Sequence, residues 1–339
     1  MLPAFIDYFC APGRLGGGPA EARLLQTHIS YVILAGEEVY KFKKPVDFGF
    51  LDFTTLEKRK FYCAEEVRLN RRLCPEIYLG TVAVCRQKEG FCLAPTDAVG
   101  PADEVIEYGV RMVRMPEEGM MGRLIAAGRL SGEHIDQIVD TLVPFYEQAA
   151  GETDIAAFGR AEAVAVNVLE NFDQTETFVG HPALSRERFE RISRWARAFL
   201  DRCELFDARI AAGRIRDCHG DLYSANICFA GERVYIFDCI EFNQRFRYSD
   251  VASDIAFLAM DLDYHGLEAM ARRLVDRFVA RSGDKGLLSV LDFYKGYRAY
   301  VRGKISLFTA ADPKVDEATR NACTEAAGRY FALAERYAA

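Results

Sequence analysis

The chain has 339 residues, and half of them are hydrophobic, which suggests one large domain or two lobes with a sizeable core. Its 43 Lys and Arg against 50 Asp and Glu give a net charge of −7, which argues against a general nucleic-acid binder, because such proteins usually carry a basic excess. None of the ten cysteines forms a Cys-x-x-Cys pair, so we expect buried thiols in a reducing compartment and no structural zinc. The start of the sequence does not resemble a signal peptide, and no uncharged apolar run approaches the roughly 20 residues that span a bilayer, so we expect a cytoplasmic protein with no membrane partner.

The first part of the chain predicts a small antiparallel sheet with one helix. Strand patterns bounded by turn residues predict strands at 30–34, 39–43, 80–85, 91–93 and 105–113. Helical periodicity covers residues 55–73. We therefore expect an N-terminal lobe over residues 1–114.

Helical periodicity dominates after Met115-Pro116. It predicts helices at 133–150, 161–171, 185–203, 249–263, 267–280, 287–302 and 315–337. Two short strands, 227–229 and 233–237, interrupt this pattern. The expected fold class is α+β, with a larger, mainly helical C-terminal lobe over residues 115–339.

One stretch carries a recognisable chemical pattern: His219-Gly220-Asp221, then Asn226, then a hydrophobic strand that ends in Asp238. The spacing of Asp221 and Asn226 equals that in the H-R-D-x-x-x-x-N loop of protein kinases, where a further Asp follows a strand. We predict that Asp221, with His219 beside it, forms the catalytic element and orients an acceptor hydroxyl. Carboxylate and amide oxygens suit Mg²⁺, so Asn226 and Asp238 are the predicted metal ligands. A turn and a strand cap would explain each half of the pattern alone, but not their joint spacing.

With Gly220 in place of the kinase arginine, the chain resembles the aminoglycoside phosphotransferase-like branch of the kinase-like superfamily. The resemblance covers about residues 24–339, and residues 235–263 are most similar to an uncharacterised bacterial phosphotransferase-like group. Some members of that group carry a second P-loop kinase domain, whereas this sequence has no G-x-x-x-x-G-K-[ST] run. The resemblance implies a protein kinase-like bilobal fold that uses ATP and Mg²⁺ to phosphorylate a hydroxyl of a small molecule.

Residues 39–43 place two lysines on one face of a strand. In the kinase template V-A-I-K, a small apolar residue two positions before the lysine packs against adenine. Val39 takes that position for Lys41, whereas a lysine takes it for Lys43, so we favour Lys41 as the phosphate lysine. Glu66 is its expected partner, because it shares an apolar helical stripe, whereas Glu65 lies on a mostly polar face.

The resemblance also suggests the rest of the nucleotide site. Backbone groups near Val113 and Met115 would bind adenine, and Met112 would lie behind it, although core packing explains Met112 equally well. The loop that would cover the nucleotide, residues 26–30, has no glycine, so Ser30 and backbone amides would serve instead. Gly16-Gly17-Gly18 lacks the Lys-Ser/Thr of a phosphate loop and predicts a flexible turn.

The segment after Asp238 bears on the acceptor. Residues 239–247 leave no room for a long activation loop, which favours a small hydroxylated acceptor over a protein. Glu241, Arg245 and Arg247 are predicted near that acceptor, and an arginine could bind an anionic one. Pairing of these arginines with nearby acids is the alternative. By resemblance, Asp254 braces the backbone of the His-Gly-Asp loop, while Asp250 suits a helix cap.

Two alternative functions stay open at this point. The glycine-free covering loop would also fit a catalytically weak, nucleotide-binding regulatory module. A nucleotidyl transferase on a kinase-like fold is the other alternative, and the intact Asp221 favours phosphotransfer over both. The acceptor's identity, the choice of ATP or GTP, and the oligomeric state do not follow from the sequence.

Overall fold

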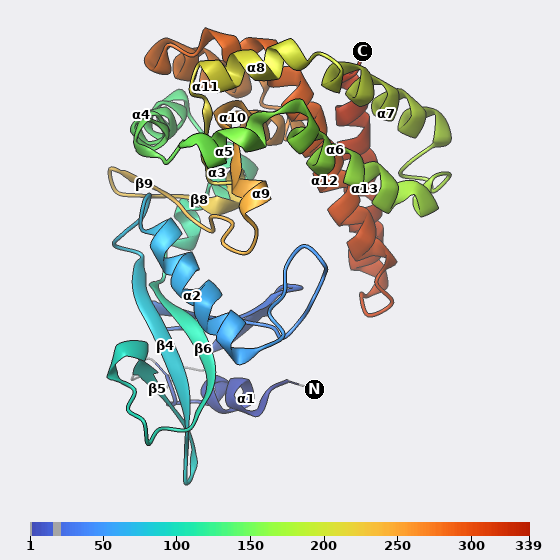
Figure 1. The fold of residues 1–339 in the computed structure, drawn as a ribbon. Coiled ribbons are helices and arrows are strands. Elements are labelled where there is room, and N and C mark those ends of the chain that lie inside the picture. The colour runs from blue at the N-terminus through green and yellow to red at the C-terminus, as the bar shows by residue number, and fades with distance from the viewer. Residues whose placement is uncertain (1, 16–21) are drawn as a thin grey trace. The chain divides into compact units, whose positions relative to one another are not determined.

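The computed structural model describes residues 2–15 and 22–339, so the predicted turn at Gly16-Gly17-Gly18 lies outside the described residues. The chain divides into two compact units, and Figure 1 labels many of their helices and strands. Unit 1 comprises Met1–Met120 and Ile227–Gln244, and unit 2 comprises Met121–Asn226 and Arg245–Ala339. The expected boundary after residue 114 kept 227–244 in the helical lobe, whereas the contacts group this segment, including Asp238, with the sheet.

Unit 1 is built on a six-stranded antiparallel sheet in the order β1-β2-β3-β6-β4-β5. Its strands are β1 (Arg23–Gln26), β2 (Ser30–Ala35), β3 (Glu38–Lys43), β4 (Tyr78–Gln87), β5 (Gly90–Pro95) and β6 (Val105–Val113). The predicted strands are all present, and only β1 was missed, because its four residues are too short for a period-two pattern.

Alternation along β3 positions the two lysines of that strand. Tyr40 and Phe42 lie in an apolar cluster with Phe5 and Phe9 of α1 (Ala4–Cys10). Because neighbouring side chains of a strand point to opposite faces, Lys41 and Lys43 share the other face. Both contact α2 (Leu56–Asn70) on that side.

Helix α2 starts at a defined cap. Thr55 accepts a hydrogen bond from the Lys58 N–H at 3.2 Å, which satisfies one of the free amides of the first turn. Its buried face includes Cys63, Glu66 and Val67. Cys63 and Val67 of this face pack with Tyr78 and Val110 of the sheet. This apolar contact holds α2 on the sheet, and Glu66 is buried on the same face.

The hairpin of β8 (Ile227–Ala230) and β9 (Arg233–Ile236) completes unit 1. Residue Cys228 forms an isolated bridge with Met120. Gly119 lies so close to β8 that a Cβ atom there would be 2.0 Å from the Phe229 carbonyl oxygen. This close approach packs the hairpin, which precedes Asp238 in the chain, against the segment that follows β6.

Unit 2 is mainly helical. Its helices are α3 (Met121–Ala126), α4 (Gly132–Gln148), α5 (Thr153–Ala156), α6 (Ala161–Thr175), α7 (Arg186–Leu200), α8 (Cys203–Ala211), α10 (Val251–Tyr264), α11 (Glu268–Ser282), α12 (Leu291–Ala311) and α13 (Glu317–Tyr337); α9 (Gln244–Arg247) begins at the unit boundary. The long helices agree with the sequence expectation, but α12 continues well past the predicted end at residue 302. No helix in the described ranges has both the length and the apolar character needed to cross a membrane.

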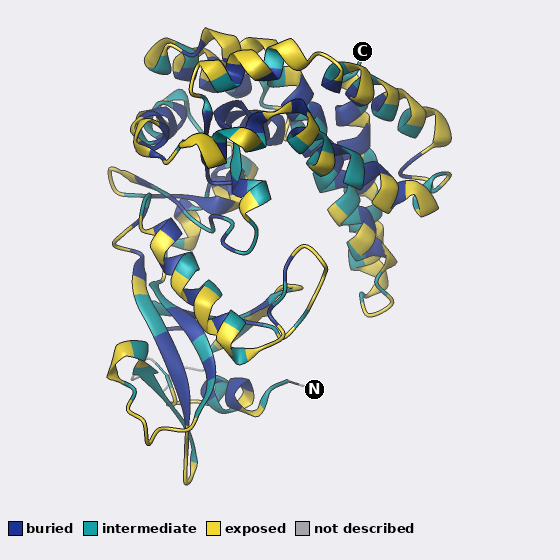
Figure 2. Ribbon diagram, in the orientation of Figure 1, coloured by how far each residue is buried: buried dark blue, intermediate teal, exposed yellow. Residues whose placement is uncertain are grey.

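A two-stranded pairing in unit 2 positions the His-Gly-Asp loop. The short strands β7 (Ile215–Asp217) and β10 (Tyr248–Asp250) pair antiparallel, with Asp217 opposite Tyr248. The His-Gly-Asp loop therefore leaves β7 beside the start of α10. Residues 251–263 of α10 are all buried, as its dark blue colour in Figure 2 shows, so this helix is a rigid support for the loop.

Candidate functional site

A buried glutamate in unit 1 is shared by two lysines. Lys41 Nζ lies 2.9 Å from Glu66 Oε1, and Lys43 Nζ lies 2.7 Å from Oε2. Glu66 is fully buried, and burial alone would raise its pKa. The two lysines outweigh burial and lower the pKa of Glu66 to about 2, so the carboxylate is held charged.

The two lysines differ in their second partners. Lys41 Nζ lies 2.5 Å from Asp238 Oδ1, and its side chain is 15% exposed. Lys43 is 1% exposed and pairs with Glu241, so it is enclosed by two acids. Burial disfavours the charge of Lys43, but Glu241 and Glu66 raise its pKa overall. Lys41 is therefore the lysine that reaches the predicted metal-binding carboxylate, while Lys43 ties α2 to the segment after Asp238.

Asp238 has an unusual backbone conformation. Among the described non-glycine residues it alone has a positive φ, at 63°. Asp tolerates this left-handed region better than most residues, but the conformation persists only where surrounding contacts impose it. The Asp238 N–H donates to the Tyr78 hydroxyl at 3.2 Å, and the Cys239 N–H donates to Asn70 Oδ1 at 2.9 Å. These contacts aim a partly exposed carboxylate, which Mg²⁺ binding requires.

Asn70 and Tyr78 were missed in the sequence analysis. Asn70 lies one helical turn after Glu66 on the buried face of α2, so helical spacing could have found it. Tyr78 lies at the start of β4, and no local pattern links it to Asp238. Glu241, which was expected near the acceptor, is placed by the structure in the buried ion-pair cluster with Lys43.

The residues predicted to surround adenine lie at the edge of an apolar cluster. Met112, Val113 and Met115 pack against the cluster that contains Tyr78 and Val110. Val39 is buried and pairs with Met112 across β3 and β6. The Val113 N–H already donates to the Ile77 carbonyl at 2.9 Å, so that amide is used within the sheet.

Ser30 has a buried hydroxyl whose Oγ forms no hydrogen bond with any residue that the structure describes. Its N–H donates to Thr27 Oγ1 at 2.9 Å, which shapes the turn between β1 and β2. The predicted contact of Ser30 with nucleotide phosphates stays a prediction.

The His-Gly-Asp loop in unit 2, the predicted catalytic element, is held by Asp254 of α10. Its carboxylate is fully buried and accepts hydrogen bonds from the His219 N–H at 2.7 Å and the Gly220 N–H at 3.0 Å. The Tyr146 hydroxyl donates to the same carboxylate at 3.0 Å. Gly220 has φ +88°, a conformation that favours glycine, which explains why the kinase arginine is replaced here.

Asp221 and Asn226 meet within this loop. Asn226 Nδ2 donates to the Asp221 carbonyl at 2.9 Å and to Asp221 Oδ2 at 3.0 Å. The amide oxygen of Asn226 is the atom that these bonds leave for a cation. His219 is fully buried, and its Nδ1 accepts the Asp221 N–H at 3.3 Å, so it shapes the loop from within. Asn226 belongs to unit 2 and Asp238 to unit 1, so their joint binding of Mg²⁺ stays a prediction.

The arginines predicted near the acceptor are both paired. Arg247 is 1% exposed and forms an ion pair with Asp217, and Arg245 lies 2.5 Å from Glu170. The structure thus has the alternative arrangement, in which both arginines pair with acids, although the acids lie farther along the chain than expected. Arg247 therefore holds the β7 end of the loop, which suits a structural role.

Arg209 is a buried residue that sequence patterns missed. Asp250 caps α10 by accepting the Ala252 N–H at 2.9 Å, as expected, and also accepts two hydrogen bonds from Arg209. The same guanidinium donates a hydrogen bond to the Asp284 carboxylate at 2.7 Å. Arg209 thereby joins α8, α10 and the segment before α12, and nothing local in the sequence marks this long-range fork.

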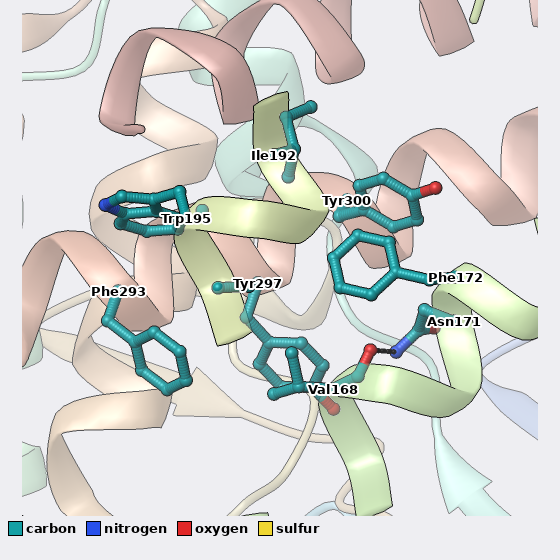
Figure 3. Close-up of a pocket in the computed structure, with 10 residues that line it drawn as sticks. Val168, Asn171, Phe172, Ile192, Trp195, Phe293, Tyr297 and Tyr300 are labelled. Carbon is teal, nitrogen blue, oxygen red and sulfur yellow. Dashed lines mark hydrogen bonds between the residues drawn. The ribbon is translucent and has the colours of Figure 1, made fainter. Parts of the chain in front are cut away.

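A small cavity in unit 2 lies apart from these residues. Figure 3 shows aromatic side chains of α6, α7 and α12 around it, including Phe172, Trp195, Tyr297 and Tyr300. Its lining is mostly apolar and contains none of the predicted site residues. The cavity therefore belongs to the helical core.

The chain was compared with known proteins. No family model matches it. The uncharacterised proteins Rv2004c of Mycobacterium tuberculosis and Mb2027c of Mycobacterium bovis are each 32% identical over 294 residues, which cover 86% of this chain and 56% of the relative. The chain thus spans about half the length of the curated relatives it matches.

Two solved structures share the fold over nearly the whole chain. The GDP complex of aminoglycoside 2′-phosphotransferase-IIIa has a TM-score of 0.52 at 14% identity, covering 97% of this chain and 99% of that one. Choline kinase from Cryptosporidium parvum has a TM-score of 0.52 at 9% identity, covering 94% and 88%. These similarities confirm the predicted resemblance at the level of the fold, a kinase-like bilobal α+β fold.

Proposed function

We propose that the chain is an ATP- and Mg²⁺-dependent phosphotransferase that acts on a hydroxyl of a small molecule. The observation that carries this proposal is the ion-pair chain Glu66–Lys41–Asp238 in unit 1. Kinase-like enzymes need a lysine that a helix glutamate holds beside a metal-binding Asp. The shared fold with a GDP-bound phosphotransferase and a choline kinase supports the same reaction class.

The chain's own residues supply the positioning that phosphoryl transfer requires. In this proposal Asp221 orients the acceptor hydroxyl and takes its proton as the oxygen bonds to the γ-phosphorus. The bond to the β–γ bridging oxygen breaks, and ADP leaves. Lys41 binds the α/β-phosphates, and Asn226 and Asp238 would hold Mg²⁺. The metal would neutralise phosphate charge when bound.

The first experiment separates binding from turnover. Thermal shift and nucleotide hydrolysis are measured with ATP and GTP, with and without Mg²⁺, for wild type, Asp221→Asn and Asp238→Asn. Asp221→Asn should keep the nucleotide-dependent stabilisation and lose turnover by about 10²–10⁴-fold, the usual range for a general base. Asp238→Asn tolerates the left-handed backbone and should lose the Mg²⁺-dependent part of the stabilisation. Absence of any nucleotide-dependent shift in wild type would refute the proposal, and stabilisation without turnover on a broad acceptor panel would favour a regulatory module.

A second experiment tests the assignment of the lysine and its glutamate. Lys41→Met should weaken nucleotide binding, while Lys43→Met should mainly lower thermal stability, because Lys43 is enclosed by acids. Glu65→Gln is the matched control for Glu66→Gln, since Glu65 is adjacent but pairs with Arg68 on the surface. Equal nucleotide affinity in Glu65→Gln and Glu66→Gln would contradict the proposed role of Glu66.

A further inference from the structure

An arginine of α12 lies against the predicted catalytic loop in unit 2. The guanidinium carbon of Arg302 is 4.7 Å from the ring centroid of Tyr223, two residues after Asp221. It is also 5.8 Å from the ring centroid of Tyr330 in α13. The packing of α12, α13 and the loop thus brings a cation against Tyr223 and within electrostatic range of Asp221, the predicted catalytic carboxylate.

Aromatic stacking holds Arg302 in place. Tyr223 stacks on Phe257 of α10 with centroids 5.5 Å apart, and Tyr330 stacks on Tyr264 with centroids 3.8 Å apart, both with rings inclined by 10°. Rings that cover the faces of a guanidinium leave its N–H donors, which lie in its plane, as the groups that can bind a partner. The arginine is therefore preorganised by rings that are themselves packed.

Arg302 is partly buried and, among the described residues, has no carboxylate partner such as Arg209 and Arg247 have; Arg298, which also has no ion pair there, instead donates to the Ser253 hydroxyl at 3.2 Å. Arg209 and Arg247 each form ion pairs with acids, whereas no ion pair within the described ranges includes Arg302. Its Nε is buried and has no hydrogen-bond partner among the residues described. Burial disfavours its charge, yet Tyr223, Tyr330 and Asp221 raise the pKa of Arg302 overall, so it stays charged. Keeping a desolvated, unpaired donor is costly unless an anion is bound during function.

We propose that Arg302 binds an anionic group of the acceptor, so that the substrate is a hydroxylated compound carrying a phosphate or carboxylate. The inference rests on the proposed function, in which Asp221 faces the acceptor hydroxyl. A cation within electrostatic range of Asp221 is then on the acceptor side of the reaction. Planar guanidinium donors match phosphate and carboxylate oxygens in bidentate geometry. Arg245 and Arg247 are already paired, which leaves Arg302 as the arginine suited to this task.

Anion binding is tested first without nucleotide. Inorganic phosphate is titrated by calorimetry and thermal shift into wild type, Arg302→Met, Arg302→Lys and Arg329→Met. Arg329 lies 4.2 Å over Tyr264 at the far end of the same stack, so it controls for loss of a stacked cation. A loss of phosphate binding in Lys41→Met would show how much of the phosphate binds at the lysines of unit 1. Arg302→Met should weaken phosphate binding about tenfold or more, as loss of a charge-assisted bond predicts, while Arg329→Met retains it and Arg302→Lys retains part. Lys41→Met should remove only phosphate that binds at the unit 1 lysines, so the part of the binding that depends on Arg302 is measured in that variant.

The acceptor class is tested with matched pairs of compounds. Glycerate against glycerol, and glucose 6-phosphate against glucose, are incubated with the enzyme, ATP and Mg²⁺, and product is detected by mass spectrometry. Turnover of an anionic member, with a KM raised about tenfold or more in Arg302→Met, supports the inference. The carboxylate and phosphate pairs show which anion is preferred.

A failure of the anionic-acceptor inference can be distinguished from a failure of the proposed phosphotransferase function. Equal phosphate binding in all variants, or turnover of neutral members only, would overturn the anionic acceptor while leaving the phosphotransferase intact. No nucleotide binding together with Arg302-dependent phosphate binding would overturn the proposed function but support an anion site at Arg302. Circular dichroism of each variant establishes that the fold is retained, and the charge-preserving Arg302→Lys keeps the test valid if Arg302→Met unfolds.

Discussion

Replacing Asp254 by Asn keeps the size of a fully buried side chain and removes its charge. The carboxylate uses both oxygens to accept the His219 and Gly220 amides. The single carbonyl oxygen of Asn can accept one of these amides, and its NH₂ group faces the other donor. The variant therefore loses a charge-assisted hydrogen bond and leaves a buried N–H without a partner.

The cost can be estimated from these two effects. A hydrogen bond to a charged group contributes about 1.5–3 kcal/mol, and an unsatisfied buried donor costs about 1–3 kcal/mol. We expect the loop to lose about 3 kcal/mol of local stability at the lower end of the combined range. Because about 1.4 kcal/mol corresponds to a factor of ten, amide exchange of the loop should accelerate by roughly 100-fold.

The assay is hydrogen exchange followed by mass spectrometry on peptides that cover residues 217–226, with turnover measured in parallel. Asp263→Asn is the matched control, because Asp263 is a buried carboxylate of the same helix that pairs with Lys295 and Tyr337. It should destabilise the helix packing but leave loop exchange nearly unchanged. If Asp254→Asn and Asp263→Asn accelerate exchange of the loop equally, the bracing role of Asp254 is refuted.

Other predictions concern stability. Arg209→Lys should lower the free energy of unfolding by about 3–5 kcal/mol in urea titrations, because one ammonium cannot replace a fork between two buried carboxylates; a loss below about 1 kcal/mol would contradict this. Gly119→Ala should lower the melting temperature, since its Cβ would lie 2.0 Å from the Phe229 carbonyl oxygen, whereas Gly122→Ala, with open space around its Cβ, should not. Glu66 has its pKa lowered to about 2 in the fold, so its contribution is fully present above its unfolded pKa of about 4.3 and is lost as pH falls toward 2. The difference in unfolding free energy between wild type and Glu66→Gln should therefore shrink by roughly 3 kcal/mol over that range, and a difference independent of pH would show that Glu66 is not held charged.

Local patterns in the sequence were sufficient for most of the secondary structure. The strand at residues 105–113 and the helices around Glu66 and Asp254 follow from periods of two and 3.6 residues, which depend only on neighbouring side chains. The motif from His219 to Asp238 predicted the catalytic and metal-binding residues from local spacing, and these roles stay predictions. The short elements β7 and β10 were missed, since three residues carry too little pattern and form only by pairing with each other.

The placement of charged side chains was decided by tertiary contacts. Lys41 and Lys43 share one strand face, so alternation could not separate them, and only the folded chain places Asp238 beside the first and Glu241 beside the second. The contact between Arg302 and Tyr223 could not be predicted either, because no local pattern around Arg302 indicates which distant side chain it packs against.

By itself, therefore, the sequence determined the order of the long helices and most strands and the inward direction of Glu66, and it predicted the motif from His219 to Asp238. The packed structure decided which acid pairs with Lys41, Lys43 and Arg209, and it left Arg302 without an ion pair among the described residues. The physical reason is that helix and strand periodicity is set by local backbone geometry, whereas an ion pair depends on which distant segments are buried together. In the described part of the chain, tertiary packing places Arg302 against Tyr223 and near Asp221. It pairs Arg245 and Arg247, the arginines that the sequence pattern favoured, with Glu170 and Asp217.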